Sequence, residues 1–301
     1  MTTAADRPIA DQQAADQQTV VVGVDGSEGA LGAARWAAAL ADRYGIPLTL
    51  VHAIPQLRWH FTSIDPSGEV DRSAAGDAVL AAAEDAVRAT HPGVVIWAAA
   101  VKGGVGTVLA DASDAARIVV VGAGDHRSLG GHTVRIAHRT LCPVVIWRAP
   151  VATSSGKPLP VVVGVDESDA SARAVAEAFD IACTLHAPLM VVHMWELDAA
   201  VGMGDLGGQG MMDWPLLEVL QSQQRQRMDE LVEPLARKYR NAHVTKIFQD
   251  ISPAKGLTDL SREAQLVVVG GSGHGRLADA ILGSVSQNLL HHAECPLLVV
   301  R

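Results

Sequence analysis

The chain is poor in aromatic residues, in cysteine and in positive charge. Aromatic side chains make up 4% of its 301 residues, whereas 49% of the residues are hydrophobic. A folded core must therefore be built from aliphatic side chains. No stretch approaches the ~18–20 continuous apolar residues of a membrane-spanning helix, and the composition excludes a disordered or fibrous chain. A core rich in valine and alanine suits parallel strands covered by helices.

Cysteine usage and charge exclude further classes of protein. Cys142, Cys183 and Cys295 show no paired short spacing, which argues against a disulfide framework and against a zinc site, so we expect no bound metal in the fold itself. The formal net charge is −9, so the basic surface of a general nucleic-acid binder is missing. Residues 1–18 are polar, without the apolar segment of a signal peptide. We expect a disordered tail there, a cytoplasmic protein, and neither nucleic acid nor membrane as a partner.

The sequence contains a tandem repeat. Residues 20–53 align without a gap to residues 161–194, and 14 of these 34 positions are identical. The match resumes further along the chain, where residues 118–122 correspond to residues 266–270. Because the offset between the copies grows, the second copy carries insertions. The chain therefore consists of two unequal copies of one domain.

The two copies are joined by a stretch rich in proline, serine and other small residues, as is typical of a linker. The predicted organisation is a disordered tail (1–18), a first domain (19–149), a linker (150–160) and a second domain (161–301). Within each copy, short valine-rich runs alternate with longer helical patterns. This alternation predicts an α/β fold with a doubly wound parallel sheet and right-handed crossovers.

The second copy illustrates the predicted elements. Its expected strands are 161–165, 189–193, 244–248, 266–269 and 296–300. Its expected helices are 170–185, 218–239, 254–264 and 284–292. It also carries an insertion rich in glycine and methionine, residues 199–212. We interpret the insertion as a surface loop, with a lid over a ligand or a surface for a partner as the alternative.

The most informative stretch follows the fourth predicted strand of the second copy. Four glycines within residues 270–275 let the backbone turn and approach a ligand closely. Gly283 and Ser284 then begin a predicted helix, whose free N–H groups and dipole favour an anion. Loops that follow parallel strands meet at one edge of the sheet, so Asp166, after the first strand, should lie nearby. The stretch has neither a Walker lysine nor the dinucleotide-binding spacing, yet it suits a di- or triphosphate held by backbone groups.

These residues resemble the ATP-binding branch of the universal stress protein family. The resemblance rests on the spacing Gly270-x-x-Gly273-nine residues-Gly283-Ser284 and on the opening Val-Val-Gly-Val-Asp166. It extends over both copies and is similar to the tandem chains common in actinobacteria. The resemblance implies that each copy is a five-stranded sheet of order 3-2-1-4-5, of the adenine nucleotide alpha-hydrolase-like kind.

The resemblance also implies an ATP site in the second domain, with or without Mg²⁺. Asp166 would contact adenine, and Met194 would add backbone contacts to the base. The other implied contacts come from Gly164, Gly270, Gly273, Gly283, Ser284 and Val285. No catalytic residue stands out, so the leading hypothesis is an ATP-binding regulatory protein of the stress response with an unknown protein partner. The alternatives are a slow ATPase and a ligand-free interaction module.

The first domain carries a degenerate version of the motif. Asp25 is present, but only seven residues separate Gly122 from Gly130, five fewer than in the second domain. Gly131 replaces the serine, and Asp125 brings a negative charge to the place where phosphates would lie. We therefore expect weak ATP binding or none in the first domain. Asp25 would then help Ser27 to cap the next helix.

Two further expectations concern histidines and assembly. His52 and His193 each end a predicted strand, and we interpret them as core histidines with satisfied hydrogen bonds rather than as ligands. Members of the family often pair through their fifth strands. The resemblance therefore implies either a homodimer or pairing of residues 143–147 with 296–300 within one chain.

Overall fold

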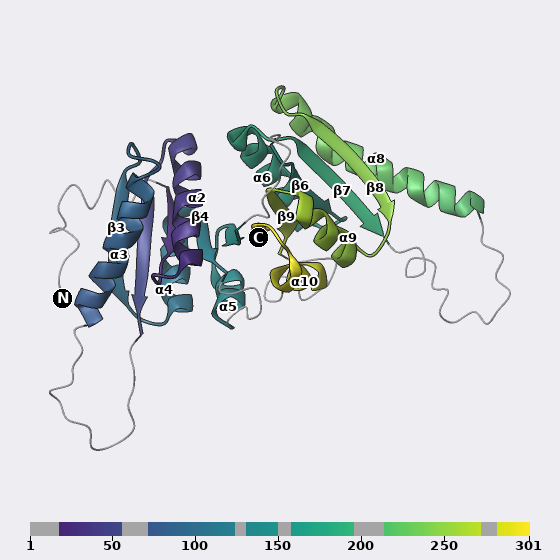
Figure 1. The fold of residues 1–301 in the computed structure, drawn as a ribbon. Helices are drawn as coiled ribbons and strands as arrows, with labels where there is room; N and C mark the ends of the chain where they lie inside the picture. Colours follow the sequence, from purple (N-terminus) through teal and green to yellow (C-terminus); the bar gives the residue numbers. More distant parts are fainter. Residues whose placement is uncertain (1–17, 56–71, 124–130, 150–157, 196–213, 272–281) are drawn as a thin grey trace, which may run out of the picture. The chain divides into compact units, whose positions relative to one another are not determined.

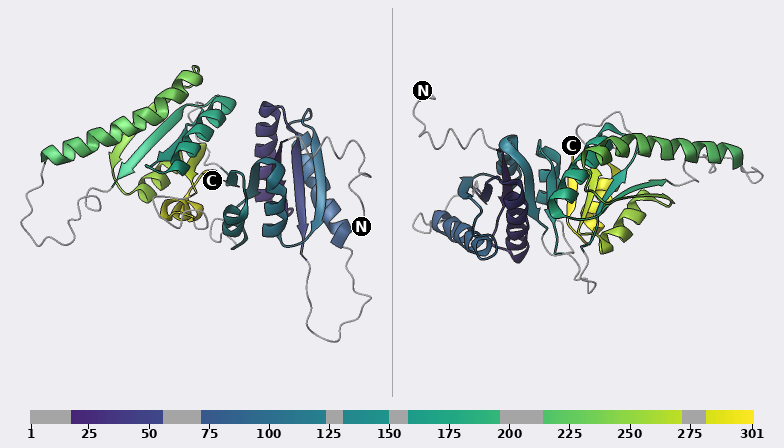
Figure 2. Two further views of the ribbon diagram at one scale, coloured as in Figure 1. Left: turned by 180° about the vertical axis from the view of Figure 1, so that it is seen from behind. Right: turned by 90° about the horizontal axis from the view of Figure 1, so that it is seen from above.

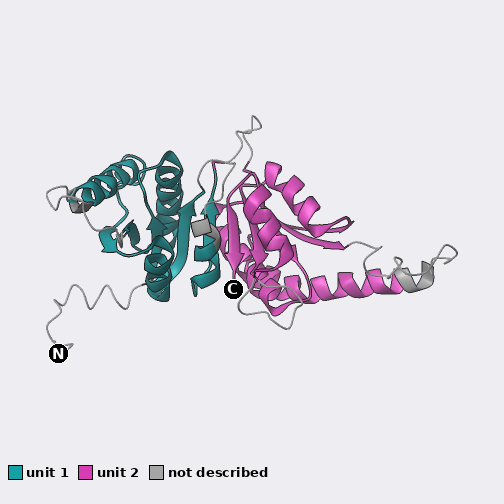
Figure 3. Ribbon diagram, turned by 90° about the horizontal axis from the view of Figure 1, so that it is seen from below, with its two compact units in different colours: residues 1–148 teal, residues 149–301 magenta. Residues whose placement is uncertain are grey.

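The computed structural model describes residues 18–55, 72–123, 131–149, 158–195, 214–271 and 282–301. The chain divides into two compact units, residues 1–148 and 149–301 (Figure 3). The predicted tail falls almost entirely outside the described residues. So do most of the predicted linker, the insertion at 199–212 and most of the two glycine loops, at 124–130 and 272–281.

The first unit alternates strands and helices along the chain (Figure 1). Its strands are β1 (Thr19–Gly23), β2 (Leu48–Ile54), β3 (Ile96–Lys102), β4 (Ala116–Gly122) and β5 (Val144–Trp147). Its helices are α2 (Glu28–Tyr44), α3 (Arg72–Arg88), α4 (Val105–Ala112), the 3₁₀ turn η2 (Ser113–Ala115) and α5 (Gly131–Arg139). The strands pair in parallel in the order β3-β2-β1-β4-β5.

The second unit repeats this plan. Its strands are β6 (Val161–Val165), β7 (Leu189–Trp195), β8 (Val244–Asp250), β9 (Leu266–Gly270) and β10 (Leu297–Val300). Its helices are α6 (Asp169–Leu185), α8 (Trp214–Lys238), α9 (Pro253–Leu260), the 3₁₀ turn η3 (Ser261–Glu263) and α10 (Ser284–His292). The parallel order is β8-β7-β6-β9-β10. Both units thus have the predicted 3-2-1-4-5 order. The helix expected at 254–264 begins one residue earlier, because proline suits the first helical position.

Helices cover both faces of each sheet (Figure 2). In the first unit α2 and α3 contact one another and the sheet, and α4 packs with α5. In the second unit the corresponding pairs are α6 with α8 and α9 with α10. Small side chains allow close packing: the fully buried residues of α2 include Ala33, Ala34, Ala37, Ala38 and Ala41. Phe179 is the one aromatic residue among the largest fully buried side chains of the described regions, which confirms the expected aliphatic core.

A buried serine braces the N-terminal edge of each sheet. The hydroxyl of Ser113 donates to the carbonyl three residues earlier (2.6 Å) and accepts from the backbone N–H of Leu141 (3.0 Å). In the second unit Ser261 donates to the carbonyl three residues earlier (2.6 Å) and accepts from the N–H of Glu294 (2.9 Å). Each serine therefore ties the turn before the fourth strand to the segment before the fifth.

The first helix of each unit ends at a left-handed residue. Gly45 closes α2 with φ 65°, and His186 closes α6 with φ 52°. In both units the N–H of this residue donates to carbonyls of the last helical turn. Among the described residues, His186 is the one non-glycine residue with positive φ. Its Cβ makes the left-handed conformation costly, whereas Gly45 adopts it without a steric penalty.

Replacing His186 with glycine should stabilise the second unit. His186→Gly is expected to raise the free energy of unfolding by about 0.5–1 kcal/mol, because relief of the left-handed strain exceeds the added chain entropy of glycine. The matched change Gly45→His should lower it by a similar amount. No atom lies within 4 Å of a Cβ built on Gly45, so that effect would come from the backbone alone. Urea unfolding followed by circular dichroism measures both, and a less stable His186→Gly variant would contradict the prediction.

Candidate functional site

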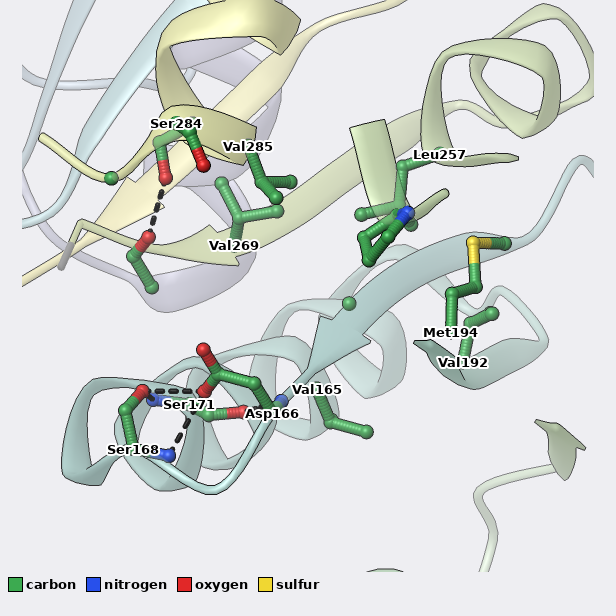
Figure 4. A pocket seen from close by; sticks show the side chains of 15 residues that line it. Val165, Asp166, Ser168, Ser171, Val192, Met194, Leu257, Val269, Ser284 and Val285 are labelled. Atoms are coloured by element: carbon green, nitrogen blue, oxygen red, sulfur yellow. Dashed lines mark hydrogen bonds between the residues drawn. The ribbon is translucent and has the colours of Figure 1, made fainter. Parts of the chain in front are cut away.

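The second unit contains a cavity of about 250 Å³ at the C-terminal edge of its sheet. It lies between the ends of β6 and β9, where the strand order reverses, as is usual for ligand sites in open α/β sheets. Figure 4 shows the lining side chains, which come from strand ends, from α9 and from the starts of α6 and α10. The lining residues are Gly164, Val165, Asp166, Ser168, Ser171, Val192, Met194, Pro253, Leu257, Val269, Gly270, Gly283, Ser284, Val285 and Ser286.

Most residues that the sequence nominated for an ATP site meet in this cavity. They are Gly164, Asp166, Met194, Gly270, Gly283, Ser284 and Val285. Gly273 lies outside the described residues. The sequence reasoning missed Ser171, Pro253 and Leu257. A serine in the first turn of α6, where the first copy has alanine, was the available signal for Ser171, whereas the α9 residues carried none.

The loop after β6 is held in place by its own side chains. One carboxylate oxygen of Asp166 accepts from the backbone N–H (2.9 Å) and from the hydroxyl (2.5 Å) of Ser168. The N–H of Asp166 donates to the hydroxyl of Ser171 (2.9 Å), and Ser168 caps α6 by accepting from the N–H of Ser171 (3.1 Å). The dashed lines in Figure 4 trace these bonds. The exposed carboxylate is therefore presented to the cavity in a defined orientation.

The first turn of α10 offers backbone donors to the cavity. Among the described residues no side chain caps this helix at Gly283, and the first backbone bond of its ladder runs from the N–H of Gln287 to the carbonyl of Gly283 (2.9 Å). The hydroxyl of Ser286 donates to the carbonyl of Gly270 (2.7 Å) and holds the helix start against the end of β9. The first N–H groups of a helix have no partner within the helix, and together with the positive end of the helix dipole they suit an anion.

The opposite end of the cavity is apolar. Figure 4 shows Val192, Met194 and Leu257 together, away from Ser284. Missing side chains allow this packing: a Cβ on Gly256 would lie 2.3 Å from Sδ of Met194, and one on Gly164 would lie 2.7 Å from a methyl of Leu257. The cavity can therefore hold a ligand with an apolar part at one end and an anionic part at the other.

The corresponding loop of the first unit is simpler. Asp25 accepts from the N–H of Ser27 (3.0 Å), and Ser27 caps α2 by accepting from the N–H of Ala30 (3.2 Å). Ser27 is thus the N-cap of α2, and Asp25 supports it. The sequence predicted that the two residues share this capping role. Ala30 stands where the second unit has Ser171, so it offers no hydroxyl to the N–H of Asp25.

The glycine at the end of β4 has a packing role in the first unit. A Cβ on Gly122 would lie 2.6 Å from the carbonyl carbon of Gly29, at the start of α2. Gly130, the other residue nominated there, lies outside the described residues. In the described part of the first unit, the end of β4 therefore packs closely against the start of α2.

His52 and His193 lie two residues before the ends of β2 and β7, and each makes a hydrogen bond of the kind expected from the sequence. Nδ1 of His52 lies 2.8 Å from the carbonyl of Val24, and Nδ1 of His193 lies 3.0 Å from the carbonyl of Val165. Each ring ties the end of the second strand to the first. Within the described ranges, no group of three or more His, Cys, Asp or Glu side chains is placed to hold a metal ion. In those same ranges, no helix is both long enough and apolar enough to cross a membrane.

Comparison with known proteins assigns the family. The model of the universal stress protein family matches residues 17–148 and again residues 159–301. The universal stress protein Rv2623 of Mycobacterium tuberculosis is 33% identical, with 94% of this chain and 96% of the relative covered. A universal stress protein of Mycolicibacterium smegmatis is 31% identical, with 96% and 99% covered. This chain is a tandem α/β protein, and it belongs to the universal stress protein family.

A solved structure gives the same fold. The crystal structure of a universal stress protein from Archaeoglobus fulgidus matches 94% of this chain and 96% of its own length, with a TM-score of 0.67 and 18% identity. At this identity the match supports the fold alone.

Enlarging Gly256 and shortening Met194 tests how closely the two residues pack at the apolar end of the cavity. Gly256→Val should lower the free energy of unfolding by about 1–3 kcal/mol, because the new side chain collides with Met194. Adding Met194→Ala should recover much of this loss, since the first unit has alanine and valine at the equivalent Ala53 and Val108. Chemical denaturation of the double-mutant cycle should give a coupling of about 1 kcal/mol or more. Additive effects would show that the two residues are not packed together as described.

Proposed function

We propose that the second unit binds ATP and that the chain is a nucleotide-responsive regulatory protein. The supporting observation is the division of one cavity into an apolar end and an anion-binding end, with the Asp166 loop along its side. Such a division matches a nucleotide, which joins a flat base to a polyphosphate. Backbone donors at a glycine-rich helix start are well suited to phosphate oxygens.

Each end of the cavity receives a part of the nucleotide. The base would lie against Val192, Met194 and Leu257, with the exposed carboxylate of Asp166 accepting a hydrogen bond from it. The phosphates would lie at the start of α10, where the hydroxyl of Ser284 supplements the backbone N–H groups. Mg²⁺ would bind together with the phosphates rather than in a site of its own, because Asp166 is the one carboxylate among the described lining residues.

The site belongs to the second unit in this proposal. The first unit has Ala30 in place of Ser171 and Gly131 in place of Ser284, and so lacks two hydroxyls of the site. Its shorter glycine loop also carries Asp125, whose charge would repel a polyphosphate. The duplicated domain would therefore provide one strong site per chain.

Binding without fast turnover fits the described lining. Hydrolysis commonly needs a positioned acid or base, or a cation at the leaving group. Asp166 is the one ionisable side chain among the described lining residues, and it already accepts two hydrogen bonds from Ser168. We therefore propose a stable ATP complex, whose occupancy changes the conformation or the partners of the protein.

Calorimetric titration with ATP should give one strong site per chain. Gly273→Asp should abolish this site by placing a negative side chain against the phosphates, and mass spectrometry should find ATP co-purifying with the wild-type chain alone. Two equivalent sites would contradict the assignment to the second unit. Sustained ADP release that Gly273→Asp removes would instead favour the slow ATPase.

The aspartates of the two units form a matched pair for testing the base contact. Asp166→Ala should weaken ATP binding about ten- to hundredfold, as expected for loss of a hydrogen bond to a charged group. Asp25→Ala makes the same change in the first unit and should leave the affinity unchanged. Equal effects of both changes, or no effect of either, would contradict the assignment. Competition with a fluorescent ATP analogue measures all three proteins.

A further inference from the structure

Glu167 connects the loop beside the candidate ligand cavity to helix α8. Its carboxylate accepts a hydrogen bond from the side-chain amide of Gln224 (2.6 Å) and forms an ion pair with Arg227. Gln224 and Arg227 are three residues apart and so lie on the same face of α8. Glu167 directly follows Asp166 but does not line the ligand cavity. The loop that presents Asp166 is thus held by a helix that follows it by about fifty residues in the chain.

A second cavity, of about 330 Å³, lies on the other side of this loop. It shares Val165, Asp166 and Ser168 with the ligand cavity. Its other walls include Gln224 and Arg227 of α8. Successive side chains of β7 point to opposite faces of the sheet, and accordingly Met194 lines the first cavity and its neighbour His193 the second. The loop is therefore the wall between the ligand cavity and α8.

The first unit has the same contact without the charges. Gly26 occupies the place of Glu167, and Gly76 and Val79 of α3 occupy those of Gln224 and Arg227. A Cβ on Gly26 would lie 3.4 Å from a methyl of Val79, so helix and loop meet at the same place. In the described parts of the two units, the polar connection between loop and helix occurs in the second unit, where the loop lines the candidate ligand cavity.

We propose that Glu167, Gln224 and Arg227 form a clamp that positions Asp166 for the ligand and couples occupancy of the cavity to α8. This inference rests on the proposed ATP binding. The three residues are positioning residues, since none of them lines the ligand cavity. By thermodynamic linkage, a clamp that strengthens ATP binding is itself strengthened by ATP to the same degree.

The variant Glu167→Ala separates a clamp from a simple charge effect. ATP is an anion, so removing a nearby negative charge would by itself tighten binding. The clamp predicts the opposite. Affinity should fall about three- to tenfold, the range set by one half-exposed ion pair and one exposed hydrogen bond from an amide to a carboxylate. Isothermal titration with ATP measures the change, and circular dichroism verifies that the variant is folded.

Three further variants control for the position of the charges. Arg227→Glu should also weaken binding, and the exchanged pair Glu167→Arg with Arg227→Glu should restore most of the affinity. Arg237→Glu makes the same charge change elsewhere on α8, where Arg237 pairs with Glu233 at 3.6 Å in an exposed position. It should leave ATP affinity unchanged.

Hydrogen exchange tests the coupling to α8. ATP should slow amide exchange of residues 224–228 in the wild-type chain and have little effect there in Glu167→Ala. A wild-type chain that binds ATP, together with a Glu167→Ala variant that binds equally or more tightly, would overturn the clamp and leave the proposed function standing. A wild-type chain without affinity for ATP would overturn the proposed function, and the clamp with it.

Discussion

The close approach of the fourth strand to the first helix is the constraint on which the candidate site depends. A side chain on Gly122 would collide with the backbone at Gly29, and one on Gly270 would approach Ala170 to 2.9 Å. With hydrogen in place of a side chain, the end of the strand and the start of the helix stay together. That contact brings the loop after the first strand beside the end of the fourth strand.

The two units place different side chains on the same scaffold. Their strand orders agree, and both tie the second strand to the first through a histidine. They differ in the side chains placed on that frame: the second unit adds the hydroxyl of Ser171 and the carboxylate of Glu167 where the first has alanine and glycine. These two differences lie at the C-terminal edge of the sheet, where binding residues of α/β folds are usually found.

The fold could be predicted from the sequence because its signals are local and repeated. Valine-rich runs, alanine-rich helices and a gapless internal match define the strands and their order of appearance, and the resemblance supplied the 3-2-1-4-5 order. The glycines of the candidate site and Asp166 could be predicted from the sequence, because their spacing is recognisable. Pro253 and Leu257 were not, because they reach the cavity through the tertiary packing of α9, which no local pattern encodes. The contact of Glu167 with Arg227 was hidden for the same reason, since it joins segments about sixty residues apart.

The buried serines at the other edge of the sheets have a consequence for how the duplicated domain could change. Ser113 and Ser261 make the same two hydrogen bonds at the same place in their units, at distances that agree within 0.1 Å. They close the sheet from the edge remote from the candidate site and use nothing from the loops at that site. Substitutions in the loops at the candidate site would therefore leave these hydrogen bonds at the opposite edge in place. If loops of the second unit were transplanted onto the first, the hydrogen bonds of Ser113 would still join the turn before the fourth strand to the segment before the fifth.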